Sequence, residues 1–438
     1  MQRSVSSPAS ISGDLSVPGD KSISHRSLIL NAVARGDALV TGLSSGADVM
    51  STMGCLQAMG VGIEAGDQAG TVTVHGTWQR AGGGLREPEG ILDAGNAGTS
   101  MRLLAGLLAG QPFTSVLTGD ASLRTRPMGR IVQPLKQMGA QIMAREDDTL
   151  APLTIRGGSL KGIEYTMPVA SAQLKSCIML AGLSADGETI LHQPALSRDH
   201  TERMVTAMGG TVISDGLTLV VRPTDLDAVD IAIPGDISSA AFWLVAGLCH
   251  PNSRILVRGV GLNPSRTGIL DALEAMGAGD SLQMVDERTE GGEPVADLLV
   301  TSAQLTGTEI QGDLIPRILD EIPILAVAAC FAEGDTVIRD ARELRVKESD
   351  RIATTVGELT RLGANLEERE DGMVIHGSGG GPGTLTGAQC ESHLDHRLAM
   401  ALGVAGLLAQ GETTIGGAED ASISYPEFWE HLDRISVK

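Results

Sequence analysis

Residues 24–42, SHRSLILNAVARGDALVTG, carry the pattern that decides the fold of this 438-residue chain. An apolar run suited to a helix buried on every side ends near Gly36, and a short strand-like segment follows. A polar loop, a second helix and a Met-Gly turn complete the unit. The unit occurs six times, with apolar runs that begin near Ser22, Gly98, Ser171, Ser238, Asp320 and His396. This repetition predicts a duplicated α/β architecture rather than one irregular domain.

The turn after the second helix has a recognisable marker in five of the six units. It recurs at Met59-Gly60, Met138-Gly139, Met208-Gly209, Met276-Gly277 and Leu362-Gly363. Segments after these turns, such as TVTVHG from Thr71, alternate in polarity as β-strands do. Each unit is therefore expected to contain two helices and several short strands.

A second repeat divides the six units into two groups of three. The segments VPGD at 17–20 and IPGD at 233–236 are nearly identical, and each directly precedes the first helix of a group. Pro-Gly favours a turn, so both segments are suited to carry the chain between domains. We expect one domain at 21–235 and a second built from 1–20 and 236–438.

The composition excludes several classes of function. The net charge is −21, from 33 Lys and Arg against 54 Asp and Glu, which argues against a general nucleic-acid or membrane-surface binder. The longest apolar run, 322–332, is too short to span a bilayer. The five cysteines are scattered and the N-terminus lacks a signal-peptide pattern, so we expect a cytoplasmic protein.

The first helix start, PGDKSISHR from Pro18, combines Lys21, Ser22 and Arg26. Exposed N–H groups at such a terminus favour a phosphate. The segment does not match a P-loop. That motif requires a glycine directly before the lysine and a second glycine five residues before the first. Surface charges on an ordinary helix cap are the alternative interpretation.

The second and third helix starts also carry polar residues. Asn96 and Gly98 open the second, with Arg102 one turn later, and its neighbouring loop offers Arg124 and Arg126. Small residues allow close approach of backbone to ligand, and guanidinium binds phosphate or carboxylate as a fork. The third start offers hydroxyl, amide and cationic groups, namely Ser171, Gln173, Lys175 and the loop residue Arg198. A plain cap-and-turn sequence remains the alternative for each.

The fifth and sixth units supply carboxylates together with cations. Asp320 begins a very apolar helix, and the following loop, LRVKESDR from Leu344, contains Lys347, Glu348 and Arg351. A carboxylate beside several cations can act in proton transfer, whereas a salt-bridged helix N-terminus is the alternative. The sixth unit gives His393-x-x-His396-Arg397. Two histidines without further ligands are a poor zinc signal, so no metal is expected.

Seven motifs, in order along nearly the whole chain, resemble the 5-enolpyruvylshikimate-3-phosphate synthase (EPSP synthase) family. They are GDKSISHR from Gly19, GNAGTSMR from Gly95, RPMG from Arg126, SAQLKS from Ser171, RDHTE from Arg198, LRVKESDR from Leu344 and DHRLAM from Asp395. The segments GDASLRTRPMG, DEIPILA and SYPEF are similar to those of the second bacterial class of that family. The resemblance implies a two-lobed inside-out α/β barrel of six βαβαββ repeats, three per domain, with buried helices that start at the cleft.

The resemblance also implies a reaction and a set of site residues. The enolpyruvyl group of phosphoenolpyruvate passes to the 5-hydroxyl of shikimate 3-phosphate, phosphate is released, and no cofactor takes part. The implied catalytic residues are Asp320, Glu348 and Lys21. Those implied for shikimate 3-phosphate are Lys21, Ser22, Arg26, Ser171, Gln173, Arg198, Asp320 and Lys347. Those implied for phosphoenolpyruvate are Lys21, Asn96, Gly98, Arg126, Gln173, Lys347, Arg351 and Arg397. The inhibitor glyphosate and a monomeric state are implied as well.

Some positions depart from the better-known class of the family. Ile423 stands where that class has a lysine, and Ser122 stands where it has an arginine, so Arg124 or Arg126 is left to contact phosphoenolpyruvate. Glyphosate-tolerant members of the second class carry alanine at the position of Gly98. Glycine at this position leaves room for glyphosate and predicts stronger inhibition than in those members.

Two alternative functions fit the sequence less well. An enolpyruvyl transferase acting on UDP-N-acetylglucosamine carries a reactive cysteine after its second helix, and 114–130 contains none. A non-catalytic repeat scaffold would not require charged residues gathered at helix starts.

Overall fold

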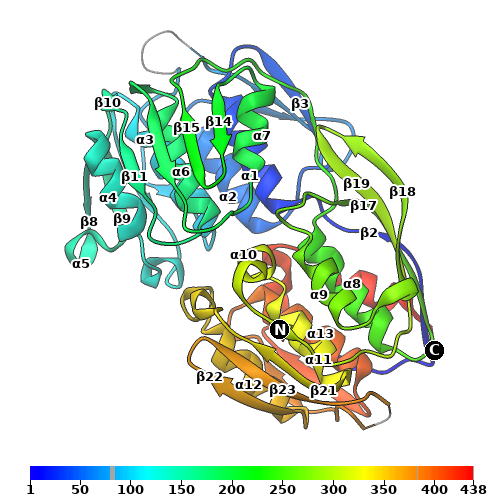
Figure 1. Ribbon diagram of the computed structural model, residues 1–438. Helices are drawn as coiled ribbons and strands as arrows, with labels where there is room; N and C mark the ends of the chain where they lie inside the picture. The colour runs from blue at the N-terminus through cyan, green and yellow to red at the C-terminus, as the bar shows by residue number, and fades with distance from the viewer. Residues whose placement is uncertain (79–83, 382, 438) are drawn as a thin grey trace. The chain divides into compact units, whose positions relative to one another are not determined.

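The computed structural model describes residues 1–78, 84–381 and 383–437. The chain divides into two compact units, which are described separately (Figure 1). Gly19–Ile233 form the first, called the inserted unit. Met1–Pro18 and Pro234–Lys438 form the second, called the terminal unit.

The inserted unit contains three four-stranded sheets of the same topology among its described residues. Their strand orders are β16-β3-β5-β4, β6-β7-β9-β8 and β11-β13-β15-β14, and in each the first pair is parallel and the other two pairs are antiparallel. The strands are β3 (Asp37–Thr41), β4 (Gly62–Ala65), β5 (Val72–His75), β6 (Leu92–Asp93), β7 (Thr114–Thr118), β8 (Gln141–Ala144), β9 (Leu150–Arg156), β11 (Glu164–Thr166), β13 (Thr189–His192), β14 (Val212–Asp215), β15 (Thr218–Val221) and β16 (Ile231–Ala232). A parallel pair joined by a helix followed by a hairpin is the βαβαββ pattern.

The terminal unit varies this topology, with one five-stranded, one four-stranded and one three-stranded sheet among its described residues. Its sheets have the orders β18-β19-β17-β2-β26, β20-β21-β23-β22 and β1-β25-β24. The strands are β1 (Gln2–Ser6), β2 (Ser10–Ser16), β17 (Ser253–Gly261), β18 (Leu282–Glu290), β19 (Glu293–Thr301), β20 (Glu309–Ile310), β21 (Glu333–Ile338), β22 (Asn365–Arg369), β23 (Gly372–Ser378), β24 (Gln389–Glu391), β25 (Glu412–Gly416) and β26 (Ser436–Val437). The parallel pairs are β2 with β17, β20 with β21 and β24 with β25.

One helix in each repeat is buried along nearly its whole length. These helices are α1 (Lys21–Ala32), α3 (Gly98–Ala109), α6 (Ala172–Gly182), α8 (Ile237–Cys249), α11 (Ile322–Phe331) and α13 (His396–Leu408). In the inserted unit α3 packs against α1 and α6, and in the terminal unit α8, α11 and α13 pack against one another. The predicted apolar runs thus form the two hydrophobic cores.

Close approach of α3 to α6 depends on a single glycine. A Cβ atom built on Gly106 would lie 2.1 Å from the backbone oxygen of Cys177, far inside van der Waals contact. Since backbone atoms cannot move aside as a flexible side chain can, only glycine fits at this crossing.

The second helix of each repeat is amphipathic and covers a sheet. These helices are α2 (Ala47–Ala58), α4 (Gly129–Met138), α7 (His200–Ala207), α9 (Gly268–Ala275), α12 (Arg351–Arg361) and α14 (Phe428–Ile435). All but α14 end in the predicted Met-Gly or Leu-Gly turn. At α2, Gly60 has φ 86° and its N–H binds the oxygen of Gln57, while Val61 N–H binds that of Leu56. This pair of bonds is the Schellman motif, which requires a left-handed residue and so favours glycine. The same pair closes the other four helices, at Gly139, Gly209, Gly277 and Gly363.

Two strands are exchanged between the repeats at the ends of the units. The strand before α1, β2, pairs with β17 of the terminal unit, and the strand before α8, β16, pairs with β3 of the inserted unit. The N-terminal strand β1 completes the last sheet beside β25. With these exchanges, the predicted α/β fold of six βαβαββ repeats, three in each unit, is confirmed.

We predict that Gly106→Ala lowers the free energy of unfolding of the inserted unit by about 1–3 kcal/mol, because an added methyl group in a packed core forces the backbone apart. Gly54→Ala, in α2, is the matched control. Its Cβ would meet nothing within 4 Å, so the same change should stabilise by about 0.5–1 kcal/mol. Urea unfolding of both variants measures the difference. Equal midpoints would show that the α3–α6 contact tolerates a side chain.

Candidate active site

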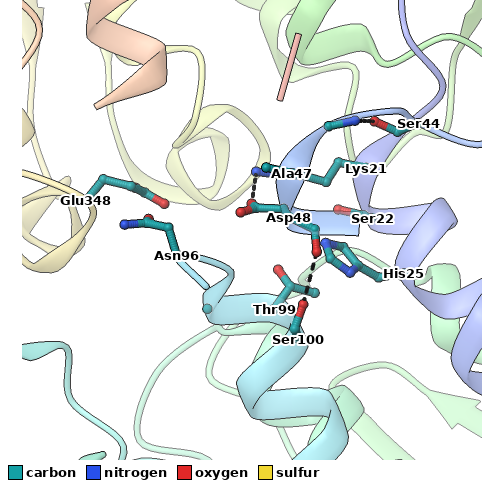
Figure 2. Close-up of polar contacts among 12 residues, drawn as sticks. Lys21, Ser22, His25, Ser44, Ala47, Asp48, Asn96, Thr99, Ser100 and Glu348 are labelled. Carbon is teal, nitrogen blue, oxygen red and sulfur yellow. Dashed lines mark hydrogen bonds and ion pairs between the residues drawn. The ribbon is translucent and has the colours of Figure 1, made fainter. Parts of the chain in front are cut away.

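The first turn of α1 presents a lysine that is held by a carboxylate. Asp20 caps the helix by accepting from the N–H of Ile23 at 2.9 Å. Lys21 then extends toward α2, where its Nζ donates to Oδ2 of Asp48 at 2.9 Å (Figure 2). The Lys21 side chain is 17% exposed and that of Asp48 is 8% exposed. This ion pair therefore holds the ammonium group of Lys21 in one position near the surface.

Ser22, Arg26 and Arg198 lie around the same start of α1. Arg198, in the loop before α7, donates to the hydroxyl of Ser22 at 3.4 Å. Arg26 is buried and binds Thr201 Oγ1 at 2.7 Å and Ser176 Oγ at 2.8 Å. Arg26 thus ties α1 to α6 and α7, whereas Arg198 and Ser22 lie closer to the surface.

At the start of α3 the structure distinguishes between two neighbouring arginines. The Arg126 side chain is buried, donates to the backbone oxygen of Asn96 at 3.2 Å and also binds its side-chain oxygen. A Cβ on Gly98 would lie 3.5 Å from Arg126 Nη1. Arg124 is exposed and its Nε donates to the backbone oxygen of Asp120. Arg126 is therefore the arginine that lies at this helix terminus.

Arg102 connects the second helix start with the third. Its Nη1 donates to Oε1 of Gln173 at 2.7 Å and lies 2.7 Å from where a Cβ on Gly98 would be. Gln173 in turn donates to the hydroxyl of Thr99 at 3.0 Å. Ser171 caps α6 by accepting from a backbone N–H. The side chains at these two helix starts consequently form one hydrogen-bonded group.

Lys175 is set apart from this surface group. It is buried, pairs with Glu202 at 2.5 Å and donates to the backbone oxygen of Ser197 at 3.1 Å. These contacts give it an internal role in joining α6 to the loop before α7.

In the terminal unit, one buried guanidinium gathers three carboxylates. Arg351 is 2% exposed and donates to Asp395 at 2.8 Å, to Glu348 at 2.6 Å and to Asp320 at 3.2 Å. Burial alone would lower the pKa of Arg351, but Asp395, Glu348 and Asp320 together raise it. The cation is permanently charged, and it orients two less buried carboxylates, those of Asp320 and Glu348.

Lys347 lies beside the same carboxylates. Burial lowers the pKa of its ammonium, while the charges of Asp320 and Glu343 oppose that shift. Next to Asp320, Glu321 occupies the position before α11 and accepts a hydrogen bond from the hydroxyl of Ser238 on α8. The start of α11 is thereby held from two sides.

The start of α13 carries Arg397 and the capping residue Asp395. Asp395 is fully buried, and its Oδ1 accepts from the N–H of Arg397 at 2.9 Å. Arg397 is itself buried, and its Nε and Nη1 have no hydrogen-bond partner among the described residues. Buried guanidinium donors without partners are costly in a resting protein, and they are suited to bind an anion.

Comparison of the sequence with models of protein families shows the family of this chain. The family model described as EPSP synthase (3-phosphoshikimate 1-carboxyvinyltransferase) matches residues 5–432. The chain belongs to the EPSP synthase family.

Individual relatives extend over the same length. The chain is 54% identical to a 3-phosphoshikimate 1-carboxyvinyltransferase of Herpetosiphon aurantiacus, with 99% of each chain covered. It is 55% identical to one of Gloeobacter violaceus, over 97% of this chain and 96% of the other. A solved EPSP synthase from Acinetobacter baumannii superposes with a TM-score of 0.87 at 44% identity, covering 100% and 99% of the two chains. The enolpyruvyl transferase NikO from Streptomyces tendae, at 18% identity and a TM-score of 0.79, shares the fold.

Three residues that organise the site were not among the predicted site residues. Asp48 stands in the first turn of a predicted second helix, where an acidic residue is unremarkable. Asp395 belongs to a quoted motif, but its buried pairing with Arg351 joins distant segments. Arg102 was noted one turn inside its helix, although its contact with Gln173 was not foreseen.

Neither a metal cluster nor a membrane span is found in the part of the chain that the structure describes. Residues 1–78, 84–381 and 383–437 contain no group of three or more His, Cys, Asp or Glu side chains suited to a metal ion. His393 binds Glu358 at 2.8 Å, while His396 is buried in α13. No helix within those ranges is long and apolar enough to cross a membrane.

We predict that Arg351→Met costs about 3–5 kcal/mol of stability, because it leaves the buried carboxylate of Asp395 without its cation. Arg345→Met is the matched control in the preceding loop. Arg345 pairs with the half-exposed Asp350 and Glu368, so its loss should cost no more than about 1 kcal/mol. Thermal and urea unfolding measure both changes. A small cost at Arg351 would contradict the interpretation of a buried charge cluster.

Proposed function

We propose that this member of the EPSP synthase family transfers the enolpyruvyl group of phosphoenolpyruvate to the 5-hydroxyl of shikimate 3-phosphate and releases phosphate. One observation carries the proposal. Buried Arg351 holds two partly exposed carboxylates, Asp320 and Glu348, beside Lys347. The reaction needs one group to accept a proton and another to donate one, and a fixed pair of carboxylates can divide these tasks.

Shikimate 3-phosphate is the more highly hydroxylated substrate and carries a phosphate. We assign its phosphate and ring hydroxyls to the first turns of α1 and α6, which offer both cations and neutral polar groups. The proposed residues are Lys21, Ser22, Arg26, Ser171, Gln173, Arg198, Asp320 and Lys347. The contact between Arg198 and Ser22 supports this set, and the internal bonds of Arg26 assign it to orienting α1 as well.

Phosphoenolpyruvate carries a carboxylate and a phosphate on a three-carbon frame. We assign it to Lys21, Asn96, Gly98, Arg126, Gln173, Lys347, Arg351 and Arg397. Two features support the set. Arg397 Nε and Nη1, which have no hydrogen-bond partner among the described residues, are suited to bind an anion. Gly98 lets the guanidinium groups of Arg102 and Arg126 lie close to the start of α3, since a Cβ there would be 2.7 Å from Arg102 Nη1 and 3.5 Å from Arg126 Nη1.

The chemistry follows from the charge states of these side chains. Asp320, which pairs with Arg351 at 3.2 Å, accepts the proton of the 5-hydroxyl as the hydroxyl oxygen bonds to C2 of phosphoenolpyruvate. Glu348, assisted by Lys21, donates a proton to C3, which becomes a methyl group. The adduct then loses phosphate from C2 and returns a proton from C3 to the carboxylate of Glu348, and the double bond is restored. The surrounding cations stabilise the leaving phosphate.

Three further properties are proposed on the same basis. Glyphosate is expected to compete for the phosphoenolpyruvate site. The protein is expected to be a monomer in the cytoplasm, and size-exclusion chromatography coupled to light scattering tests the monomeric state.

Phosphate release tests the activity directly. Purified protein should release phosphate from phosphoenolpyruvate when shikimate 3-phosphate is present, and should not do so with UDP-N-acetylglucosamine as the acceptor. Release with the second acceptor alone would replace this proposal with the alternative enolpyruvyl transferase.

We predict that Asp320→Asn and Glu348→Gln each lower kcat by roughly two to four orders of magnitude, because each removes a proton-transfer group and keeps its shape. Binding of shikimate 3-phosphate, measured by calorimetry, should survive the Glu348 change. Asp313→Asn, at a nearby exposed carboxylate, is the control and should leave kcat unchanged. Near-normal turnover in either test variant would remove that residue from the chemistry.

We predict that Gly98→Ala weakens glyphosate inhibition more than it weakens phosphoenolpyruvate binding. The new Cβ would lie 2.7 Å from Arg102 Nη1, which already binds Gln173, so the methyl group narrows the site. One methyl-sized change discriminates by about 1–3 kcal/mol, roughly 10- to 200-fold, and glyphosate is the longer molecule. Inhibition and the KM for phosphoenolpyruvate are measured in both proteins, with Gly54→Ala as the control. Unchanged inhibition would refute the steric argument.

A further inference from the structure

A fully buried histidine lies one helical turn after the lysine at the start of α1. These residues are His25 and Lys21, and the histidine side chain has no exposed surface. Its Nδ1 lies 2.7 Å from the hydroxyl of Thr52 on α2, which lies 2.5 Å from the hydroxyl of Ser100 on α3. The Ser100 hydroxyl donates to the backbone oxygen of Asp48 at 3.3 Å (Figure 2). Three helix starts are therefore joined by one chain of hydrogen bonds.

The direction of every bond in this chain follows from its last member. A carbonyl oxygen can only accept, so Ser100 must donate its single hydroxyl proton to Asp48. Thr52 must then donate to Ser100, and His25 must donate to Thr52 through Nδ1. The imidazole consequently has its proton on Nδ1.

The surroundings of His25 keep the ring neutral. Burial lowers its pKa, and the positive charges of Lys21 and Arg26 lower it further. In this neutral tautomer Nε2 is an acceptor, and it has no hydrogen-bond partner among the described residues. An added proton there would be a buried donor without an acceptor beside two cations, so the charged form is disfavoured.

The hydrogen-bond chain ends on the residue that fixes Lys21. The backbone oxygen of Asp48 receives the bond from Ser100, and the carboxylate of the same residue binds Lys21 Nζ at 2.9 Å. The path starts on α1 at His25, passes through α2 and α3, and returns to α1 at Lys21. It fixes the first turn of α2 against those of α1 and α3.

We propose that His25 is a positioning residue which, through Thr52 and Ser100, sets Asp48 and thereby the ammonium of Lys21. This inference rests on the proposed function of Lys21 in the transfer reaction. His25 itself touches no substrate. Its role is to donate from Nδ1 at a buried point where water cannot substitute.

Removing the central hydroxyl tests this role with little change of shape. Thr52→Val should lower kcat on the order of 10- to 100-fold, because small displacements of a catalytic group are costly. Thr52→Ser keeps the hydroxyl and should turn over like the wild type. A hydroxyl with only a packing role would affect the unfolding temperature and leave the kcat of the folded enzyme equal in the two variants, which would overturn the proposal.

A second pair of variants tests the donor at the other end of the chain. His25→Asn places an N–H donor close to the position of Nδ1 and should retain most of the activity. His25→Leu fills similar space without a donor and should lose activity as Thr52→Val does. Equal activity of these two folded variants would contradict the proposal.

Nuclear magnetic resonance separates this inference from the proposed function. In protein labelled with ¹⁵N-histidine, the signals lost in His25→Asn should be those of a neutral Nδ1–H tautomer. In reductively methylated protein, the ¹³C signal of Lys21, assigned with Lys21→Arg, should shift in Thr52→Val and not in Thr52→Ser. Both results are expected even if the wild type failed to release phosphate, which would reject the proposed function alone. An Nε2–H tautomer, or an unshifted Lys21 signal, would overturn the positioning role.

Discussion

A helix that is buried on every side can present polar groups only at its ends, and this constraint organises the whole molecule. Six such helices form the cores of the two units. Their sides are mainly apolar, with a few buried polar residues such as Asn31, and the charged residues of these six helices lie in the first two turns. The N-terminal N–H groups and the helix dipole favour anions at the same place. Packing thus creates the surfaces where phosphate and carboxylate groups can bind.

The charges at these helix starts are balanced within the protein. Lys21 is held by Asp48, and Arg351 is held by Asp395. Each pair fixes a cation before any substrate arrives, which reduces the reorganisation needed during reaction. Arg397 differs, since two of its buried nitrogens have no partner in the described part of the chain. An acidic protein of net charge −21 can in this way maintain local sites for anions.

The repeats could be predicted from the sequence because their signals are local. Apolar runs and Met-Gly turns depend on neighbouring residues, and the Schellman bonds at Gly60 show the physical reason. The expected domain bounds already place residues 10–16 in the second domain and 231–232 in the first. The pairing of β2 with β17 and of β16 with β3 was not predicted, because a strand as short as Ile231–Ala232 leaves almost no pattern. Partners such as Asp48 for Lys21 were also missed. Their pairing depends on how two helices pack, which no single segment reveals.

The central claim is that the enolpyruvyl group is transferred by protonation of C3, addition at C2 and elimination of phosphate. Turnover of phosphoenolpyruvate with shikimate 3-phosphate in D₂O tests it most directly, with the product examined by nuclear magnetic resonance. The account predicts deuterium at the vinyl carbon of the product, because C3 passes through a methyl group that receives a solvent-derived proton. A product formed at the normal rate without deuterium at that carbon would contradict the account.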